Sequence, residues 1–516
     1  MVNIAYVRRI SYLYLIAPVL MFFVGWLNTL AMLVLTLFCL GSIINILRLN
    51  TVVYFPFEKK DAIFSSLLIL IWVLLSGVGG FTFQNWDHHS RNALFHDLIN
   101  YSWPVVYNGT ILDTVQAYVP QKFILSYYFG FWLPAAFIGK LLGWNVANMF
   151  LLIWSVLGVF LFTTITAYKI NLSSLKTILL IIFFSGMDIL GSLLFQNLPL
   201  YTYPKLFPPI VHLEWWAGTF GFLQYSSFTT DLFWTYNQFI PVFLIMSLFV
   251  SSLDFREYVF LTGLCVFFAP LPAVGLLLYV IAYWVKKYFH RNKTTVFDFL
   301  KDILCIENIS GGMIAGVSLL FFSTNFSVEE KSFGLPASLL LFLFFSLFEW
   351  LILWLFLLPA NKKDERWYVT GVILLFFPFL SLGGSWDFMM RASIPSLYFL
   401  LIACGSFLST ELNIKRKLPL LIFLLIGSTT PIYEINRSVF RTMYYFNLPV
   451  PSSVSQYFEN PPNYGLRFVP ELDHIQTLSA DEWQSISIPN DEGWVTKAGG
   501  LFPDFYRFIW KDDLVN

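Results

Sequence analysis

The chain has 516 residues, of which 57% are hydrophobic, 20% aromatic and only 12% charged, and its 31 basic and 31 acidic side chains cancel. Soluble domains are usually about 45–50% apolar, whereas apolar runs of roughly 17–25 residues, long enough to cross a bilayer, recur along nearly this whole chain. The composition excludes a soluble protein, gives no indication of nucleic-acid binding, and predicts an all-α polytopic membrane protein.

The first apolar runs set the orientation of the chain. Arg8 and Arg9 precede the first run, and Arg48 with two lysines follows the hairpin that this run forms with the next. Because basic residues in short loops favour the cytoplasmic side, we expect a cytoplasmic N-terminus. The run at 63–80 then carries the chain out to a long extracytoplasmic loop at 81–122.

This loop begins with a stretch that is dense in charged residues and histidines and follows directly after an apolar run. Residues 83–97 hold three of the six histidines, two acids and an arginine. Asp87 and Arg91 fall on one side of a helical pattern, which predicts an amphipathic helix on the membrane surface. A local ion pair between these two residues is the plain structural alternative, worth a few tenths of a kcal/mol.

The histidines of the loop are His88, His89 and His96. His89 and His96 share one face but lie two turns apart, roughly 10 Å at 1.5 Å per residue. A straight helix cannot bring both to one ion, so a metal site would need ligands from other segments, and we predict none.

The next segment disturbs the alternation of sides. Two apolar runs, 123–141 and 146–167, separate the outer loop from Lys169 and Lys176, which mark a cytoplasmic loop. Two full crossings would return the chain outside, so we expect the first run, interrupted by Lys140, to be re-entrant or interfacial. If the two lysines faced out instead, three later basic clusters would also lie outside.

Those clusters define the rest of the topology. They occupy 286–293, 362–366 and 415–417. Further outer loops are then expected at 188–234 and 383–392, and the total is about 13 crossings with the C-terminus outside. We divide the chain into a transmembrane domain, 1–431, and a small extracytoplasmic region, 432–516.

Polar residues recur in the later outer segments. The second segment contains Asp188, Glu214, Gln224 and Gln238, together with Lys205. In the third, Arg391 stands between two apolar runs, where it could snorkel, pair with Asp387 four residues earlier, or bind phosphate.

These features resemble the GT-C superfamily of integral-membrane glycosyltransferases, which transfer a sugar from a polyprenyl-phosphate carrier on the extracytoplasmic or lumenal side. The resemblance lies in the acids Asp87 and Asp97 of the first long outer loop, its juxtamembrane helices, the many crossings and Arg391. Residues 185–191 and 387–395 also look like segments of uncharacterised bacterial members. The resemblance covers most of 63–431. The chain departs from the superfamily because two further crossings precede the acid of the first long outer loop, Asp87.

The resemblance implies roles for these residues. Transfer to a hydroxyl needs a base near that hydroxyl and positive charge near the departing phosphate. The superfamily places its base in this loop, so Asp87 is the first candidate and Asp97 the second. The planar guanidinium of Arg391 suits the donor phosphate, assisted by Lys205 or Arg91.

Other polar residues are candidates for binding sugar or acceptor groups: His88, His89, His96, Asp188, Glu214, Gln224 and Gln238. Since the leaving group is a lipid monophosphate, no cofactor is obligatory, although a divalent metal is compatible with the chemistry. The resemblance also implies inversion at the anomeric carbon.

Two other classes compete. A transporter or flippase usually places charges and broken helices near the midplane; Glu307, Glu349 and the prolines at 270 and 272 favour it. A membrane O-acyltransferase would carry a histidine deep in a helix, and none of the six does. We expect a multi-pass protein of a bacterial plasma membrane, with a wall polymer, polysaccharide or lipid as acceptor, rather than an endoplasmic-reticulum mannosyltransferase.

Overall fold

The computed structural model describes most of the chain up to residue 445 and two short pieces beyond it. The described residues are 2–49, 53–56, 58–85, 87–112, 118–195, 213–218, 221–252, 256–289, 303–323, 332–333, 337–381, 387–445, 495–497 and 509–511. All structural statements below concern these residues.

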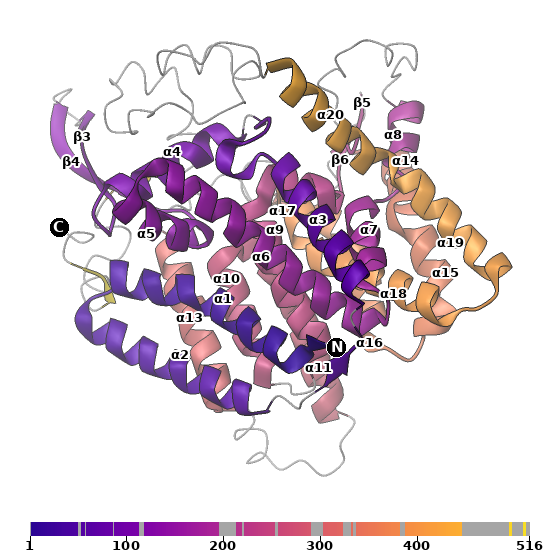
Figure 1. The fold of residues 1–516 in the computed structure, drawn as a ribbon, viewed down its shortest axis with the longest axis horizontal. Helices are drawn as coiled ribbons and strands as arrows, with labels where there is room; N and C mark the ends of the chain where they lie inside the picture. Colours follow the sequence, from indigo (N-terminus) through magenta and orange to yellow (C-terminus); the bar gives the residue numbers. More distant parts are fainter. Residues whose placement is uncertain are drawn as a thin grey trace.

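Long apolar helices form the body of the molecule (Figure 1). Among the described residues, nine helical stretches are long and apolar enough to cross a membrane: Ile4–Trp26 (α1), Thr29–Arg48 (in α2), Trp144–Ile170 (α6), Ser174–Phe195 (α7 and α8), Phe228–Ser251 (α9), Ile306–Ser323 (α13), Leu339–Asn361 (α14 to α15), Asp387–Thr410 (α17 and α18) and Ile414–Met443 (α19 and most of α20). The predicted all-α membrane protein with several crossings is therefore confirmed.

Other helices adjoin these stretches. They are α3 (Lys59–Leu75), α10 (Arg256–Phe268), α11 (Pro270–Phe289) and α16 (Glu365–Phe376). These helices are too short, or not apolar enough over a membrane-length stretch, to be counted as crossings. The total of about 13 crossings therefore stays a prediction.

Several of the spanning stretches are interrupted. Their parts are α7 (Ser174–Phe183), α8 (Asp188–Phe195), α14 (Leu339–Ser346), the π-helix η4 (Leu347–Leu351), α15 (Ile352–Asn361), α17 (Asp387–Ala392), α18 (Ile394–Thr410), α19 (Ile414–Gly427) and α20 (Thr429–Tyr445), whereas α2 (Thr29–Leu49) is continuous. Helix interruptions leave backbone groups that need other partners, and two of these breaks, before α8 and after α17, lie near the site described below.

The centre of the bundle is α9. In its apolar stretch of membrane length, 94% of the residues are buried. Phe239 and Phe243 pack against each other with ring centroids 4.1 Å apart. The helix is broken at Thr235, whose φ of −139° and ψ of 39° are not helical. The turn that precedes this break carries residues of the site.

The run expected to be re-entrant or interfacial is not one helix. It consists of the end of β4 (Tyr118–Leu125), the turn η2 (Gly130–Trp132) and α5 (Leu133–Leu142). With 10 residues, α5 is about 15 Å long at 1.5 Å per residue, half of the hydrocarbon thickness. Gly143 ends it with a φ of 85°, a conformation that glycine adopts without strain.

Short antiparallel strands are an addition to the predicted all-α fold. The sheets pair β1 (Val2–Asn3) with β2 (Tyr54–Phe55), β5 (Trp216–Gly218) with β6 (Gly221–Leu223), β7 (Ser332–Phe333) with β8 (Leu380–Ser381), and β3 (Val106–Leu112) with β4 and then β9 (Val495–Lys497). They satisfy backbone groups of loops that have no helical partner.

The predicted loop helix forms as α4 (Asp87–Asn100), but it is not a half-exposed surface helix. Every residue from Arg91 to Ile99 is buried. Its polar side chains bond inward: the Asn92 amide donates to Gln84 Oε1 at 2.9 Å. The expectation of a helix lying on the membrane surface is therefore corrected: α4 packs within the protein, where α5 contacts it.

The C-terminal part of the chain is joined to the bundle. Helix α20 runs across positions 431 and 432 without a break and contacts α9, α8, α3 and α7. Further on, Trp510 forms a bridge with Leu27 and is buried, so the described end of the tail packs at the turn between α1 and α2.

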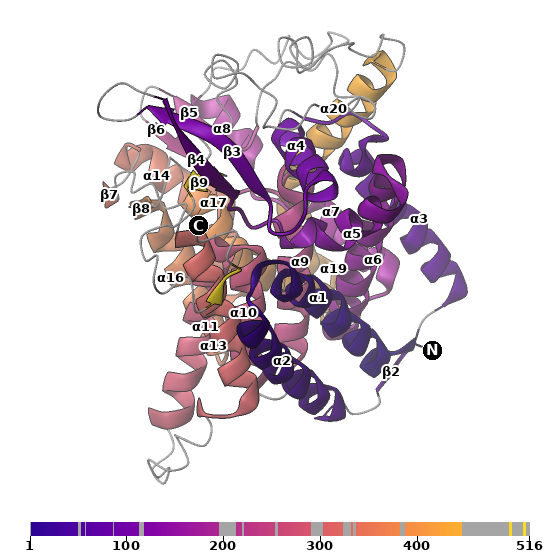
Figure 2. The same ribbon diagram turned by 90° about the vertical axis from the view of Figure 1, so that its left-hand side faces the viewer.

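The two ends of the bundle differ in character. Helices α4 and α20 and the β5–β6 hairpin lie along the top of Figure 1, and the turned view in Figure 2 agrees. We call this the loop end. Helix α11 ends at the bottom with Lys286 and Lys287 in its last turn. These two basic residues, which belong to one predicted cytoplasmic loop, thus lie at the end opposite the loop end.

Candidate functional site

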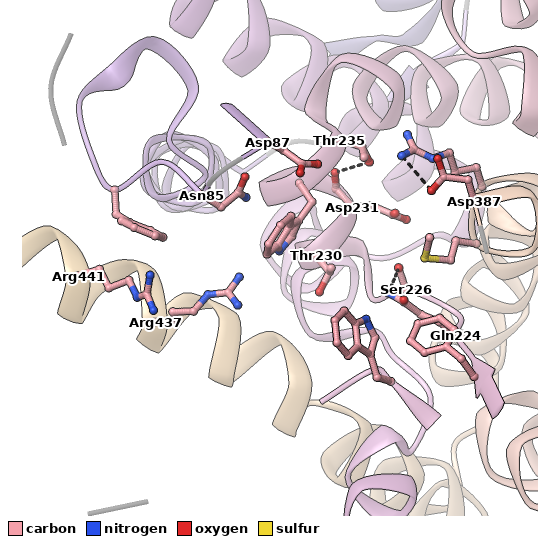
Figure 3. Close-up of a pocket in the computed structure, with 16 residues that line it drawn as sticks. Asn85, Asp87, Gln224, Ser226, Thr230, Asp231, Thr235, Asp387, Arg437 and Arg441 are labelled. Atoms are coloured by element: carbon pink, nitrogen blue, oxygen red, sulfur yellow. Dashed lines mark hydrogen bonds and ion pairs between the residues drawn. The ribbon is translucent and has the colours of Figure 1, made fainter. Parts of the chain in front are cut away.

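A cavity of about 370 Å³ opens at the loop end. It is lined by the residues before and at the start of α4, the β5–β6 hairpin and the residues beside it, the first turns of α9, helix α17, and the middle and second half of α20 (Figure 3). This volume lies within the usual range of ligand sites, roughly 300–1,000 Å³. Segments far apart in the sequence therefore converge on one cavity.

Asp87, the first residue of α4, lines the cavity and is one-third exposed. Its Oδ2 accepts a hydrogen bond from Arg91 Nη2 at 3.0 Å, which is the local ion pair foreseen from the spacing. The Arg91 guanidinium is buried and lies over the Tyr236 ring, 5.9 Å from its centroid. This pair holds the Asp87 carboxylate in place while leaving it accessible from the cavity.

Arg391, on α17, lines the same cavity. Its Nη2 donates to Asp387 Oδ1 at 3.3 Å, while its buried Nε and Nη1 have no hydrogen-bond acceptor within the described part of the chain. A buried donor without an acceptor costs about 1–3 kcal/mol. The arrangement suits an oxyanion that would supply the missing acceptors, and Asp87 lies within electrostatic range of this guanidinium.

Tyr127 lies within electrostatic range of both Arg91 and Arg391. Burial raises the pKa of its phenol well above the usual range, and Arg91 and Arg391 both act against that rise. The phenol therefore stays protonated at neutral pH. Next to it, the Tyr128 hydroxyl accepts a hydrogen bond from Gln238 Nε2 at 3.3 Å. Gln238 is buried behind the tyrosines and does not line the cavity.

Asp231 is a lining residue that the sequence analysis missed. It lies in the first turn of α9, whose N-cap Ser227 accepts from Thr230 N at 3.1 Å. The side chain is buried, and its Oδ2 has no hydrogen-bond partner among the residues described. An acid at the start of an apolar run is a signal that could have identified it.

Arg437 and Arg441 of α20 were also missed, because they fall in the region assigned to the C-terminal appendage. Both line the cavity. Arg437 is buried, forms an ion pair with Glu434, and lies 5.1 Å over the Trp234 ring. Figure 3 shows both arginines on the side of the cavity opposite Asp387, with Asp231 between.

The hairpin side of the cavity is aromatic and amide-bearing. Trp215, 41% exposed, packs edge-on against Phe222. Gln224 lines the cavity and donates from Nε2 to Glu214 Oε2 at 3.0 Å. Burial raises the pKa of Glu214 well above its usual range, and the charge of Asp188 adds to this rise. Glu214, which does not line the cavity, thus accepts the hydrogen bond that fixes the Gln224 amide in the cavity wall.

Asp188 lies outside the cavity lining, at the start of α8. Its Oδ2 accepts from Ser185 Oγ at 2.7 Å and from Thr430 Oγ1 at 2.9 Å, which links α8 to α20. Glu349 packs against Gly186, where a Cβ atom would lie 1.9 Å from Glu349 Oε2. The Ser-Gly-Met-Asp segment thus allows a close approach of two helices.

The remaining predicted residues of α4 face away from the cavity. His88 is buried, contacts the Phe233 carbonyl at 3.2 Å and stacks on Tyr236. His96 Nε2 accepts a hydrogen bond from the Asn100 amide at 2.9 Å, and Nδ1 of the same ring is 3.8 Å from Asp97 Oδ1.

Two predicted residues cannot be located. The side chain of His89 and all of Lys205 lie outside the described residues. Within the described part of the chain, no group of three or more His, Cys, Asp or Glu side chains could hold a metal ion.

The structure therefore brings Asp87, Arg391 and Gln224 to one cavity, with Arg91 bonded to Asp87. It keeps the following predicted residues out of the lining: Asp97, His88, His96, Asp188, Glu214 and Gln238. Neither a protein-family model, nor a curated protein, nor a solved structure matches the chain.

Proposed function

We propose that this protein is a glycosyltransferase that moves a sugar from a polyprenyl-phosphate carrier to a hydroxyl acceptor. The observation that carries the proposal is the convergence of Asp87 and Arg391 on one cavity. The predicted base and the predicted phosphate ligand come from distant parts of the sequence, and nothing in their spacing required them to meet.

In the proposed reaction, Asp87 accepts the proton of the acceptor hydroxyl as the acceptor oxygen attacks the anomeric carbon. The bond from that carbon to the phosphate oxygen breaks, and the bonding electrons leave with the lipid phosphate. Arg391, with two donors lacking acceptors in the described structure, stabilises the charge that develops on this phosphate. Displacement at the face opposite the leaving group gives inversion.

The other lining residues support a carbohydrate ligand. Sugar-binding sites combine a flat apolar surface with a few placed polar groups. Here Trp215 and Phe222 supply the apolar surface, and Gln224 supplies an amide fixed by Glu214. In the proposed orientation the cavity faces the extracytoplasmic side of a bacterial plasma membrane, with the N-terminus in the cytoplasm and a cell-envelope glycan or lipid as acceptor.

Three of the four features that favoured a transporter have structural explanations. Pro270 is the first residue of α11, a position where proline starts a helix rather than breaking one. Glu307 lies in the first turn of α13, where an acid suits the helix dipole. Glu349 accepts a hydrogen bond from Trp216 Nε1 at 2.6 Å, directly beside the hairpin that lines the cavity.

Release of polyprenyl phosphate from a panel of polyprenyl-phosphate sugars tests the proposal, with membranes containing the wild-type chain or Asp87→Asn. We expect release with at least one donor, reduced about 100- to 10,000-fold in the variant, as for loss of a general base. A matched control is Glu411→Gln, since Glu411 lies beyond the far end of α18. Equal release by wild type and Asp87→Asn would remove Asp87 from this role.

A further inference from the structure

Helix α20 turns its charged side chains inward. Arg437 and Arg441 line the cavity, whereas Ile432, Phe440 and Met443 are exposed on the opposite side of the helix. A helix on a soluble protein normally buries its apolar face. The inverted pattern is expected of a helix with lipid outside and a polar site inside.

This helix is fixed to the bundle next to the arginines. Ser438 Oγ donates to the Leu75 carbonyl at 2.5 Å, and Thr442 Oγ1 accepts from Phe83 N at 2.9 Å. These bonds join α20 to the end of α3 and to the loop that carries Asp87. The α20 arginines therefore belong to a defined wall of the cavity.

Each α20 arginine lies over an aromatic ring that also lines the cavity. The Arg437 guanidinium is 5.1 Å from the Trp234 centroid and the Arg441 guanidinium is 4.9 Å from the Phe83 centroid. Stacking on an aromatic face orients a guanidinium and reduces the freedom it loses on binding. Two oriented guanidinium groups one helical turn apart form a surface for an oxyanion.

The α20 arginines bring positive charge to the wall away from Arg391. Arg437 forms an ion pair with Glu434, and Arg441 lines the cavity four residues further along the helix. Both side chains lie on the side of the cavity opposite Asp387 (Figure 3).

A polyprenyl-phosphate sugar carries one phosphate, for which Arg391 is the proposed ligand. We propose that Arg437 and Arg441 form a second anion subsite, which binds a phosphate or carboxylate group of the acceptor. The inference rests on the proposed function and makes the acceptor an anionic glycan or a polyol-phosphate polymer, rather than a neutral one.

Binding to the purified full chain in detergent tests this subsite without requiring transfer. The probes are undecaprenyl phosphate for the donor side, and glycerol 3-phosphate and glucuronate as the two kinds of acceptor anion, with glycerol as the neutral control. We expect undecaprenyl phosphate and one soluble anion to bind together. Whichever soluble anion binds more tightly identifies the acceptor group as phosphate or carboxylate.

Variants assign each probe to a wall. Arg441→Gln should weaken binding of the soluble anion at least about tenfold, as for loss of a charge-assisted hydrogen bond, and change undecaprenyl phosphate binding less than twofold. Arg391→Gln should show the reverse pattern. Arg441→Lys, which keeps the charge, should retain most of the binding and shows that the position tolerates substitution, and Lys415→Gln on α19 is the remote control.

Three results would overturn the subsite: no binding of either soluble anion by the wild-type chain, equal binding by Arg441→Gln, or displacement of the soluble anion by undecaprenyl phosphate. The last result would assign the α20 arginines to the donor. Anion binding through Arg441 in a protein that transfers no sugar would retain the subsite and reject the reaction.

Discussion

The substitution Arg391→Gln separates the ligand-binding role of this arginine from any role in folding. In the described structure its Nε and Nη1 are buried without acceptors. Removing them therefore removes the free-energy cost of burying two donors without hydrogen bonds. The pair that is lost, with the half-exposed Asp387, is 3.3 Å long and is worth about 0–1 kcal/mol. We therefore expect the stability of the ligand-free variant to be unchanged or higher, by up to about 2 kcal/mol.

Ligand binding should change in the opposite direction. A hydrogen bond to a charged group contributes about 1.5–3 kcal/mol. If glutamine replaces one of the two bonds that Nε and Nη1 make to the phosphate, the loss corresponds to about 10- to 150-fold weaker binding. Undecaprenyl phosphate binding and thermal unfolding, measured on the same preparation in detergent, give both quantities.

Arg366→Gln is the matched control. Arg366 donates to Asp364 from Nε at 2.8 Å and from Nη2 at 2.6 Å, and it lies away from the cavity. Its replacement should lower stability without affecting undecaprenyl phosphate. The reasoning is refuted if Arg391→Gln binds this lipid as tightly as the control does, or if it loses affinity only in proportion to lost stability.

Other predictions concern acids and buried charges. Asp231→Asn should retain the fold and reduce polyprenyl phosphate release at least about tenfold, because a carboxylate of the cavity wall is lost; an unchanged rate would make this acid structural. Because the pKa of Glu214 is raised on folding, the native state holds its proton more tightly. Stability should therefore fall as pH rises above the usual glutamate pKa, until the folded pKa is passed. Thermal unfolding from pH 5 to 8 should show a smaller loss in Glu214→Gln, and equal slopes would contradict the assignment. Arg8→Met breaks the 2.6 Å buried pair with Glu257 and should cost about 3–5 kcal/mol, much of it restored in Arg8→Met with Glu257→Leu; no recovery in the double variant would mean that packing dominates.

A few residues of the cavity lining could be predicted because they were unusual for their surroundings. Asp87 stood in a charged stretch after an apolar run, and Arg391 lay between two apolar runs. The same criterion failed for the histidines. His88 and His96 are used in packing α4 against its neighbours, and composition does not distinguish a buried packing histidine from a ligand.

The residues that were missed show where sequence patterns lose information. Asp231 follows two threonines at the start of an apolar run, and its position on the cavity depends on the first turn of α9. Arg437 and Arg441 lie beyond a composition change that predicted a separate appendage. They line the cavity because α20 turns these arginines toward the bundle, a tertiary arrangement that helical spacing alone does not specify.

The central claim, that Asp87 and Arg391 act on one lipid-linked sugar, is tested most directly by comparing the glycans of cells that lack the protein with those of cells that produce it. The account predicts that one sugar substituent disappears without the protein, returns with the wild-type chain, and does not return with Asp87→Asn or Arg391→Gln present at equal amounts in the membrane. Identical glycans in all of these cells, or full restoration by both variants, would contradict it.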